Sequence, residues 1–482
     1  MTFGTVFSRE IIRRMQQIQC VIHVPEPYRQ RAWYGLRMLL LPFRLDPVLT
    51  DNADFEGDGV YYGTEDTDTS HLTDATWKLF IEPETWEYFE RQTTDLPPHR
   101  HVRIGEDRIP VLFGAKGDLT FDPVAATFYF LSGWQEALQR RRDEHGRFRF
   151  EGSIQEKLDI RLTPVVEWYR HIAGDALAKK GVQVERKQFG DKTWAFCSTH
   201  DIDYVRKWRP GIYKREILDR ALLNREKESH SDRLTRLVEA GWSLLHSSDP
   251  FRDAIERIQK ELDTRSVSGT FFYKAGAHGH RDVEYDLHDS YVISALSEQL
   301  SAGHEVGLHP SYHAFSHDLR LSDEKNRLER SIHRVVPAHR AHYLRFDYPG
   351  SIATLQSAGF SIDSTLGFAE CAGFRFGTCL PFPLLNPLTM DESTVWEVPL
   401  CVMESALFNR QNLTGVEAER ETNRMIQTCA SVGGVFVGLW HSTLWDERDY
   451  PGWGAHFLSS LDEARRFEAH CDSLSGVIDA WK

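Results

Sequence analysis

The stretch FCSTHDIDYV, residues 196–205, runs from apolar residues through one histidine into two aspartates that are one residue apart. In an extended strand successive side chains point to opposite faces, so Asp201 and Asp203 would share one face and Ile202 would take the other. In α/β barrel enzymes the chemistry is carried at the carboxyl ends of such strands. The stretch therefore predicts a buried strand that ends in two carboxylates at a functional site.

The rest of the chain from Lys192 onward alternates short apolar runs with helical segments. The apolar runs are WAFCSTHD, SGTFFYKAG, GHEVGLHP, GFSIDST and GGVFVGLWHS. Strands that alternate with helices form a mostly parallel sheet with right-handed crossovers. Residues 1–190 mix helical and strand-like patterns, and 482 residues are too many for one small core. We expect a mixed α/β domain over residues 1–190 and an α/β catalytic domain over residues 191–482.

The overall charge and the cysteines limit the partners and the compartment. Lys and Arg total 57 against 71 Asp and Glu, a formal net charge of -14 that disfavours nucleic acid as a partner. The first apolar stretch contains arginines, and no run reaches the roughly 18 apolar residues that span a bilayer. Seven cysteines without a CxxC pair favour reduced thiols. We expect a cytoplasmic protein.

One connection between the first two apolar runs is locally basic and rich in aromatic residues. It begins YVRKWRPGIYKREILDRALLNREK at residue 204. Two interpretations stay open for it. It is a solvated helical insertion, or its Arg and Lys side chains contact an anionic surface, so that peripheral membrane contact remains a candidate.

A second motif, AGHEVGLHPSYHAF at residues 302–315, supplies histidines. The alternation in HEVGLH predicts a strand that ends at His309, and Pro310 suits the first position of a helix. His313 would then lie in the first turn, close to His309. Two imidazoles beside a strand-end carboxylate form a set that binds Zn, Fe(II), Co(II) or Ni(II) with open positions. Each piece alone is weak in a chain with 22 histidines, but their joint placement at strand ends favours a metal site.

Six short motifs in this order resemble those of one enzyme family. They are THDID (199–203), SGTFFYKAG (268–276), GHEVGLHPSYH (303–313), YLRFD (343–347), IDST (362–365) and LWH (439–441). They resemble the polysaccharide deacetylases, carbohydrate esterase family four with its NodB homology domain, over roughly residues 192–445. Together with the residues before them, the motifs resemble THDxD-type bacterial members with an additional N-terminal domain.

The resemblance implies a fold and a metal. The fold is a distorted (β/α)7-type barrel, preceded here by the mixed α/β N-terminal domain. The metal is divalent, with Zn²⁺ favoured and Co²⁺, Ni²⁺, Mn²⁺ or Fe²⁺ as alternatives. Its ligands by resemblance are Asp203, His309 and His313.

The same resemblance implies catalytic roles. Asp201 would be the general base, Arg345 would orient that base, and His441 would be the general acid. Asp363 would support the acid histidine. The order of roles between Asp201 and Asp203 stays open, because Ile202 separates two aspartates that are adjacent in many members.

These roles imply a metal-dependent hydrolase that removes the N-acetyl group from an N-acetylated sugar or glycan precursor in cell-surface polysaccharide biosynthesis. Water bound to a divalent ion loses a proton near pH 7, and a histidine can protonate the leaving amine. Two alternatives stay open: hydrolysis of another non-peptide C–N bond, as in allantoinase or cyclic imidases, and a non-catalytic glycan-binding barrel. The sequence leaves the oligomeric state open.

Other residues near the motifs have simpler interpretations. His200 is either a donor to the site or a packed strand histidine, and Cys197 is expected to be a buried, inert thiol. Trp440 and Trp445 either form a sugar-stacking wall or belong to the core. Six further histidines are expected to face solvent or to cap helices: His278, His280, His317, His333, His339 and His342.

Overall fold

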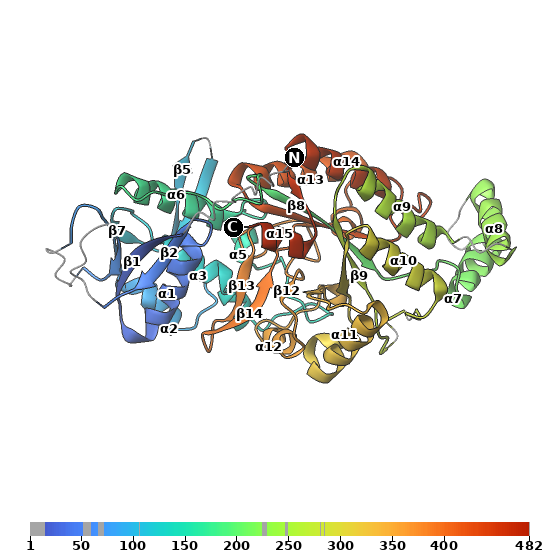
Figure 1. Cartoon of the computed structure of the whole chain (residues 1–482), viewed down its shortest axis with the longest axis horizontal. Helices are drawn as coiled ribbons and strands as arrows, with labels where there is room; N and C mark the ends of the chain where they lie inside the picture. Colours follow the sequence, from blue (N-terminus) through green and yellow to red (C-terminus); the bar gives the residue numbers. More distant parts are fainter. Residues whose placement is uncertain are drawn as a thin grey trace, which may run out of the picture. The chain divides into compact units, whose positions relative to one another are not determined.

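The computed structural model of the chain contains two compact units (Figure 1). The first unit comprises Met1–Tyr129 and Trp168–Lys187, and the second comprises Phe130–Glu167 and Gln188–Lys482. Residues 130–167, which the sequence analysis placed in an N-terminal domain over residues 1–190, therefore belong with the second unit. The structure describes residues 15–51, 59–65, 72–105, 107–223, 229–245, 249–279, 281–283 and 285–481.

The first unit is built on a mostly parallel sheet. Its strand order is β2-β1-β3-β4-β7, with the last pair antiparallel. A separate antiparallel hairpin pairs β5 with β6. The elements are β1 (Gln16–His23), α1 (Glu26–Leu40), β2 (Leu45–Leu49), β3 (Gly59–Gly63), β4 (Thr76–Ile81), α2 (Pro83–Glu90), β5 (His99–Ile104), β6 (Asp107–Leu112) and β7 (Ala115–Gly117), with α3 (Pro123–Leu131) and α6 (Val165–Lys179) crossing the unit boundaries.

The second unit contains a ten-stranded sheet in the order β13-β14-β12-β11-β10-β9-β8-β16-β15, in which β17 also pairs with β8. Neighbouring strands from β14 to β15 in this order are parallel, whereas β13 is antiparallel to β14. The strands are β8 (Ala195–Ile202), β9 (Gly269–Tyr273), β10 (Glu305–Leu308), β11 (Ala338–His339), β12 (Ile362–Asp363), β13 (Phe382–Asn386), β14 (Asp391–Glu397), β15 (Val402–Met403), β16 (Val435–His441) and β17 (His470–Cys471).

Helices connect these strands, as the alternating pattern predicted. All eight residues of β8 are buried, which is typical of a parallel strand covered on both faces. The capping box of Thr414 and Glu417 fixes the start of α13. The helices are α4 (Trp134–Leu138), α5 (Ile154–Lys157), α7 (Pro210–Tyr213), η1 (Lys214–Leu222), α8 (His230–Leu245), α9 (Pro250–Thr264), α10 (Ser290–Ser301), η2 (Ala314–Ser316), α11 (Asp318–Ile332), η3 (His342–Leu344), α12 (Gly350–Ser357), η4 (Ala406–Arg410), α13 (Gly415–Val432), α14 (Trp453–Arg466) and α15 (Leu474–Ala480).

The predicted (β/α)7-type barrel is not confirmed, because the sheet is open. Strands β8 to β12 and β14 follow one another in sheet order, and β15 and β16 lie on the other side of β8. Closure would need β15 to pair with β14 or β13, and no such pairing exists among the residues that the structure describes. The connection from β14 to β15 contains Pro399, which has no backbone N–H to donate to a ladder.

The parallel strands bring their carboxyl ends to one edge of the sheet. This edge carries the polar residues that follow β8, β9, β10, β11 and β15, together with the last residues of β12 and β16. In the part of the chain that the structure describes, no helix is both long enough and apolar enough to cross a bilayer.

Candidate active site at the carboxyl ends of the strands

The two aspartates of the opening stretch lie where the strand pattern predicted them. Asp201 is in β8 and is buried, and Asp203 follows directly after the strand with its side chain partly buried. In the pairing of β8 with β16, Asp201 lies opposite His441. His200 and Ile202 are fully buried members of β8 that alternate with the aspartates.

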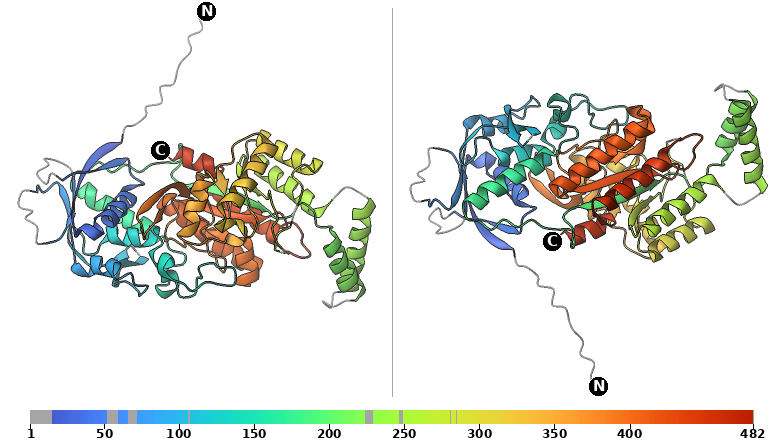
Figure 2. Two further views of the ribbon diagram at one scale, coloured as in Figure 1. Left: turned by 90° about the horizontal axis from the view of Figure 1, so that it is seen from below. Right: turned by 90° about the horizontal axis from the view of Figure 1, so that it is seen from above.

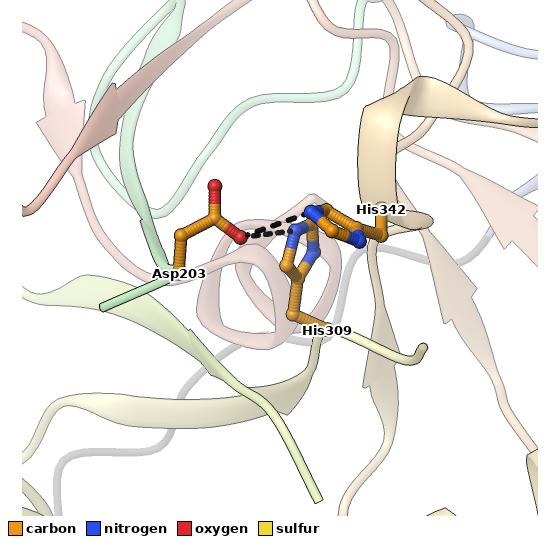
Figure 3. A group of neighbouring side chains, drawn as sticks. All are labelled: Asp203, His309 and His342. Atoms are coloured by element: carbon orange, nitrogen blue, oxygen red, sulfur yellow. Dashed lines mark ion pairs between the residues drawn. The ribbon is translucent and has the colours of Figure 1, made fainter. Parts of the chain in front are cut away.

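Asp203, His309 and His342 form a compact group at this edge. The Oδ1 atom of Asp203 is 3.4 Å from Nε2 of His309 and 3.3 Å from Nε2 of His342. Figure 3 shows both imidazoles directed at this one carboxylate oxygen. The three ligand atoms lie within 4.8 Å of one another.

The geometry of the group fits a divalent metal. Ligands at 2.0–2.1 Å in a tetrahedral zinc site are separated by about 3.3–3.4 Å. Nε2 of His309 and Oδ1 of Asp203 are buried atoms without a hydrogen-bond partner. Nδ1 of His309 donates to the carbonyl oxygen of Arg340 at 2.8 Å, which leaves the Nε2 lone pair facing the group. Nδ1 of His342 lies 3.1 Å from Oδ1 of Asp282, an outer contact of the kind that orients metal-binding histidines.

A buried lysine lies beside the same atoms. Nζ of Lys274, the residue after β9, is 3.5 Å from Oδ1 of Asp203 and 3.1 Å from Nδ1 of His342. Asp282 is 3.7 Å from the same ammonium group. A metal bound to the three ligand atoms would therefore have a positive charge as a close neighbour, which Asp282 partly offsets.

Electrostatics within the group favour a charged carboxylate. Burial alone would raise the pKa of Asp203, but His342 and Lys274 outweigh it and hold this pKa well below its usual value. Burial lowers the pKa of His309 below its usual value, although Asp201 and Asp203 oppose the shift. An ionised Asp203 and a neutral His309 are the protonation states that metal binding requires.

His313 is not part of the group, contrary to the sequence analysis. After β10 ends at Leu308, residues 309–313 form no helix, and the short η2 begins only at Ala314. The prediction placed His313 one helical turn from His309, so it fails once that turn is absent. His313 is exposed, and His342, which the sequence analysis assigned to solvent or a helix cap, takes its place beside Asp203.

Arg345 is not near Asp201. Its Nε donates to the carbonyl oxygen of His145 at 2.8 Å, and its guanidinium group lies over the ring of Tyr312. The buried arginine on the Asp201 side of the sheet is Arg340, which donates to Oγ1 of Thr199, a residue on the same face of β8 as Asp201. Burial lowers the pKa of Arg340, and the charge of Asp201 opposes this shift.

His441 is held by Glu404 and not by Asp363. Nδ1 of His441 lies 2.7 Å from Oε1 of Glu404, which is fully buried and follows β15, the strand next to β16. Asp363 lies on β12, which β11, β10, β9 and β8 separate from β16. There it contacts Nδ1 of His339 at 2.7 Å, its register partner on β11.

His441 is a strong candidate for a protonated group. Burial alone would lower the pKa of its imidazole, but the carboxylate of Glu404 outweighs burial and raises this pKa to about 10. Nε2, the ring nitrogen that Glu404 does not contact, is 3.7 Å from Oδ2 of Asp203. His441 can therefore present a proton to a molecule bound beside the aspartates.

These residues share one cavity of about 360 Å³. Asp201, Asp203, His309, His342 and His441 all line it. The volume is within the range of small-molecule sites.

Other walls of the cavity come from segments distant in sequence. Arg147 lines it from the segment 130–167, and Arg410 lines it from the end of η4. Nη1 of Arg147 donates to the carbonyl oxygen of Tyr343 at 3.0 Å. Tyr343 also lines the cavity and has a left-handed backbone, with φ of 62°. Such strained backbone is often found at functional sites.

The structure decides between the alternative interpretations of the residues near the motifs. His200 is a packed strand histidine, since its Nε2 contacts Oγ of Ser198 at 2.9 Å and burial lowers its pKa to about 3. Cys197 is a buried thiol whose pKa is raised by burial. Trp440 is fully buried and packs on Phe457, so it belongs to the core.

Of the other aromatic and imidazole side chains that the sequence analysis named and the structure describes, only His342 lines the cavity. The guanidinium group of Arg257 lies 3.6 Å from the ring centroid of Trp445, which does not line the cavity. His278, His317 and His333 are exposed as expected, and His280 lies outside the described residues. His339 and His342 are buried, so the expectation was wrong for both.

The sequence analysis missed Lys274, Asp282, Arg340, His342 and Glu404. Lys274, Arg340 and Glu404 each directly follow a strand whose carboxyl end faces the site, but only β9, before Lys274, is long enough to be recognised in the sequence. Strands β11 and β15, of two residues each, are too short to separate from a loop. Nothing local marks Asp282, which lies in an irregular connection.

Comparisons with known proteins add the following. Residues 26–182 match a family model described as a family of unknown function, DUF7033. No curated protein matches the chain. Solved structures similar to it include a protein from Mycobacterium smegmatis assigned as a polysaccharide deacetylase, with 18% identity, 60% of this chain and 90% of that chain covered, and a TM-score of 0.40.

Two further similar structures are PuuE allantoinase and a family 4 carbohydrate esterase from Streptomyces lividans in complex with acetate. The allantoinase is 10% identical, and the match covers 60% of this chain and 90% of the allantoinase with a TM-score of 0.39. The esterase has 16% identity, 44% and 80% coverage, and a TM-score of 0.24.

Proposed function

We propose that the chain is a metal-dependent hydrolase that removes the N-acetyl group from an N-acetylated sugar. The observation that carries this proposal is the joint lining of one cavity by Asp201, His441 and the group Asp203, His309 and His342. A carboxylate beside two imidazoles, with a second carboxylate and a protonated histidine, is the set needed to hydrolyse an amide.

In this proposal each side chain has one task. Asp203, His309 and His342 would hold a divalent ion, and zinc suits this set of donor atoms. The ion would act as a Lewis acid and would lower the pKa of a bound water. Asp201 accepts a proton from the attacking water, since its Oδ1 is buried and has no hydrogen-bond partner. The charge of Asp201 opposes the effect of burial on the pKa of Arg340, so a buried guanidinium group stands near the proposed base.

The leaving group needs a proton, because an amine anion does not depart from carbon in water. His441 supplies this proton from Nε2, while Glu404 holds Nδ1 and stabilises the imidazolium. Water is added across the C–N bond, so the products are acetate and a free amine. Arg147 and Arg410 line the same cavity and would donate hydrogen bonds to sugar hydroxyls or to an anionic carrier.

The test is release of acetate from N-acetylated sugars by the purified chain with zinc. We expect free amine and acetate in equal amounts, and a fall in kcat of about 10²–10⁴-fold in His441→Gln. His317→Ala, which alters an exposed histidine outside the cavity, is the matched control. If no N-acetylated sugar releases acetate while a cyclic ureide or imide is hydrolysed, the site acts on a different C–N bond and the deacetylase proposal is wrong.

A further inference from the structure

A helical insertion between β8 and β9 stands apart from the sheet (Figures 1 and 2). It consists of α7, η1 and α8, and η1 packs against α8. The insertion starts soon after Tyr204, which lines the cavity. No part of the proposed reaction uses it.

The two helices pack through polar side chains. Glu216 of η1 is fully buried and forms an ion pair with Arg236 of α8, which is 3% exposed. At one end of this seam the hydroxyl of Tyr213 is 2.9 Å from Oγ of Ser243. At the other end Nε of Arg233 donates to the carbonyl oxygen of Ala221 at 2.6 Å. Charged and polar side chains therefore fill the contact between the two helices.

Seven large apolar side chains on these helices, or directly after η1, are exposed to solvent. On α8 they recur at intervals of three or four residues, which places them on one face, and on η1 they recur at intervals of four and five, which suits a π-helix. Each is between 36% and 64% exposed. We call this set the hairpin face: Leu218, Leu222, Leu223, Leu234, Leu237, Val238 and Trp242.

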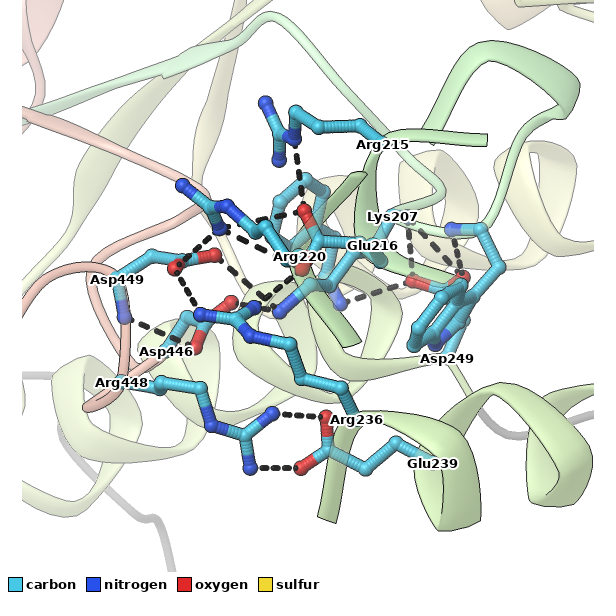
Figure 4. Close-up of polar contacts among 12 residues, drawn as sticks. Lys207, Arg215, Glu216, Arg220, Arg236, Glu239, Asp249, Asp446, Arg448 and Asp449 are labelled. Atoms are coloured by element: carbon cyan, nitrogen blue, oxygen red, sulfur yellow. Dashed lines mark hydrogen bonds and ion pairs between the residues drawn. The ribbon is translucent and has the colours of Figure 1, made fainter. Parts of the chain in front are cut away.

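Ion pairs fix the insertion to the loop after β16, as Figure 4 shows. Arg448 makes a bidentate pair with Glu239 of α8, with both N–O distances 2.8 Å. Asp449 lies 3.0 Å from Arg220 and 3.2 Å from Arg236. These ion pairs form on the side of η1 and α8 opposite the hairpin face. They therefore hold the insertion in an orientation in which the hairpin face is exposed to solvent.

The charge of the insertion is opposite to that of the chain. Residues 204–245 contain ten Lys and Arg against six Asp and Glu, in a chain of net charge -14. Lys214 and Arg215 are exposed at the start of η1. A second copy of the chain would bring an equally basic segment to the same face, and like charges would oppose such a dimer. An anionic surface is instead attracted to it.

We propose that the hairpin face inserts into the headgroup region of an anionic lipid bilayer. A helix with Leu and Trp on one face and basic residues alongside lies in the plane of such an interface. Tryptophan suits the boundary between headgroups and acyl chains, where Trp242 would lie. Basic residues near the surface add attraction to anionic lipid. This proposal does not depend on the proposed catalytic function, since it concerns binding and not turnover.

The test is flotation of the full chain with vesicles of phosphatidylcholine alone or mixed with phosphatidylglycerol. We expect binding to the mixed vesicles that weakens when salt is raised, because salt screens the electrostatic part. Leu234→Glu with Val238→Glu should lower the partition coefficient by at least about tenfold, because two apolar side chains no longer insert. The matched control is Leu319→Glu with Val416→Glu, at two exposed positions on α11 and α13.

Three results would overturn the proposal. The first is an absence of binding by the unaltered chain to mixed vesicles. The second is an equal fall in both double variants, which would show that any exposed apolar pair contributes. The third is a dimer in sedimentation analysis that Leu234→Glu with Val238→Glu converts to a monomer without vesicle binding, because the face would then serve a second copy of the chain.

Discussion

Replacing His342 by alanine separates the observed ligand group from the one that the motif resemblance implies. The structure places Nε2 of His342 at 3.3 Å from Oδ1 of Asp203, whereas His313 is exposed and outside the group. His342→Ala should therefore weaken zinc binding, and His313→Ala should leave it within about twofold.

The magnitude follows from the number of protein donors. Four-ligand zinc sites in small domains have binding free energies of about 10–16 kcal/mol, or about 3 kcal/mol per ligand. Removing one of the three donors here should then weaken zinc binding by about 10²-fold. The loss would be smaller if water replaced the imidazole at full strength, so we take about 30-fold as the lower limit.

Zinc affinity is measured by competition with a chromophoric chelator at fixed pH, and thermal unfolding of the metal-free variants checks that both remain folded. His342 packs against the rings of His309 and Tyr343, so a small loss of stability is expected in His342→Ala alone. Weakened binding in His313→Ala together with unchanged binding in His342→Ala would refute the assignment.

Three further predictions concern the surroundings of the site and the core. Glu404→Gln should lower the pKa of His441 from about 10, because it removes the carboxylate charge that outweighs burial. The alkaline limb of the pH profile of kcat/KM should then move to lower pH. An alkaline limb that stays in place would exclude His441 as the general acid. Lys274→Met should raise zinc affinity by at least about tenfold, because it removes an ammonium group that lies 3.5 Å from Oδ1 of Asp203. Zinc affinity is measured by chelator competition, and weaker binding in the variant would mean that Lys274 supports the site. Burial lowers the pKa of His456 to about 4, so between pH 6.5 and 4 the unfolded chain binds more protons than the folded chain. The free energy of unfolding should therefore fall by up to about 3 kcal/mol as the pH is lowered from 6.5 to 4. Denaturant unfolding of His456→Gln should lack this part of the pH dependence, and an equal pH dependence in both proteins would contradict the reasoning.

The sequence by itself determined the strand that carries Asp201 and leads into Asp203. Period-two alternation and an apolar run are local signals, and β8 ends at Ile202, between the two aspartates, as they predict. His309 was located for the same reason, since it lies at the end of an alternating run, whereas His441 was identified only through the resemblance of LWH to a family motif. Alternation of such runs with helical segments also sufficed for a mostly parallel sheet.

The tertiary structure alone decided which side chains meet at the site. His313 is near His309 in sequence, but the chain after β10 does not form the helical turn that would bring them together. His342 and Glu404 come from other strand ends, and their positions depend on the sheet order, which puts β11 beside β10 and β15 beside β16. Strand order is set by packing between residues far apart in the chain, so no local pattern encodes it.

The same distinction applies to the insertion after β8. Its basic and aromatic composition is visible in the sequence and left two interpretations open. Which side chains face outward depends on the pairing of Glu216 with Arg236 between its helices, a contact over 20 residues that reverses the usual burial of apolar groups. Composition is a property of the segment alone, whereas exposure is a property of the fold that surrounds it, and only the folded chain shows an apolar face directed toward solvent.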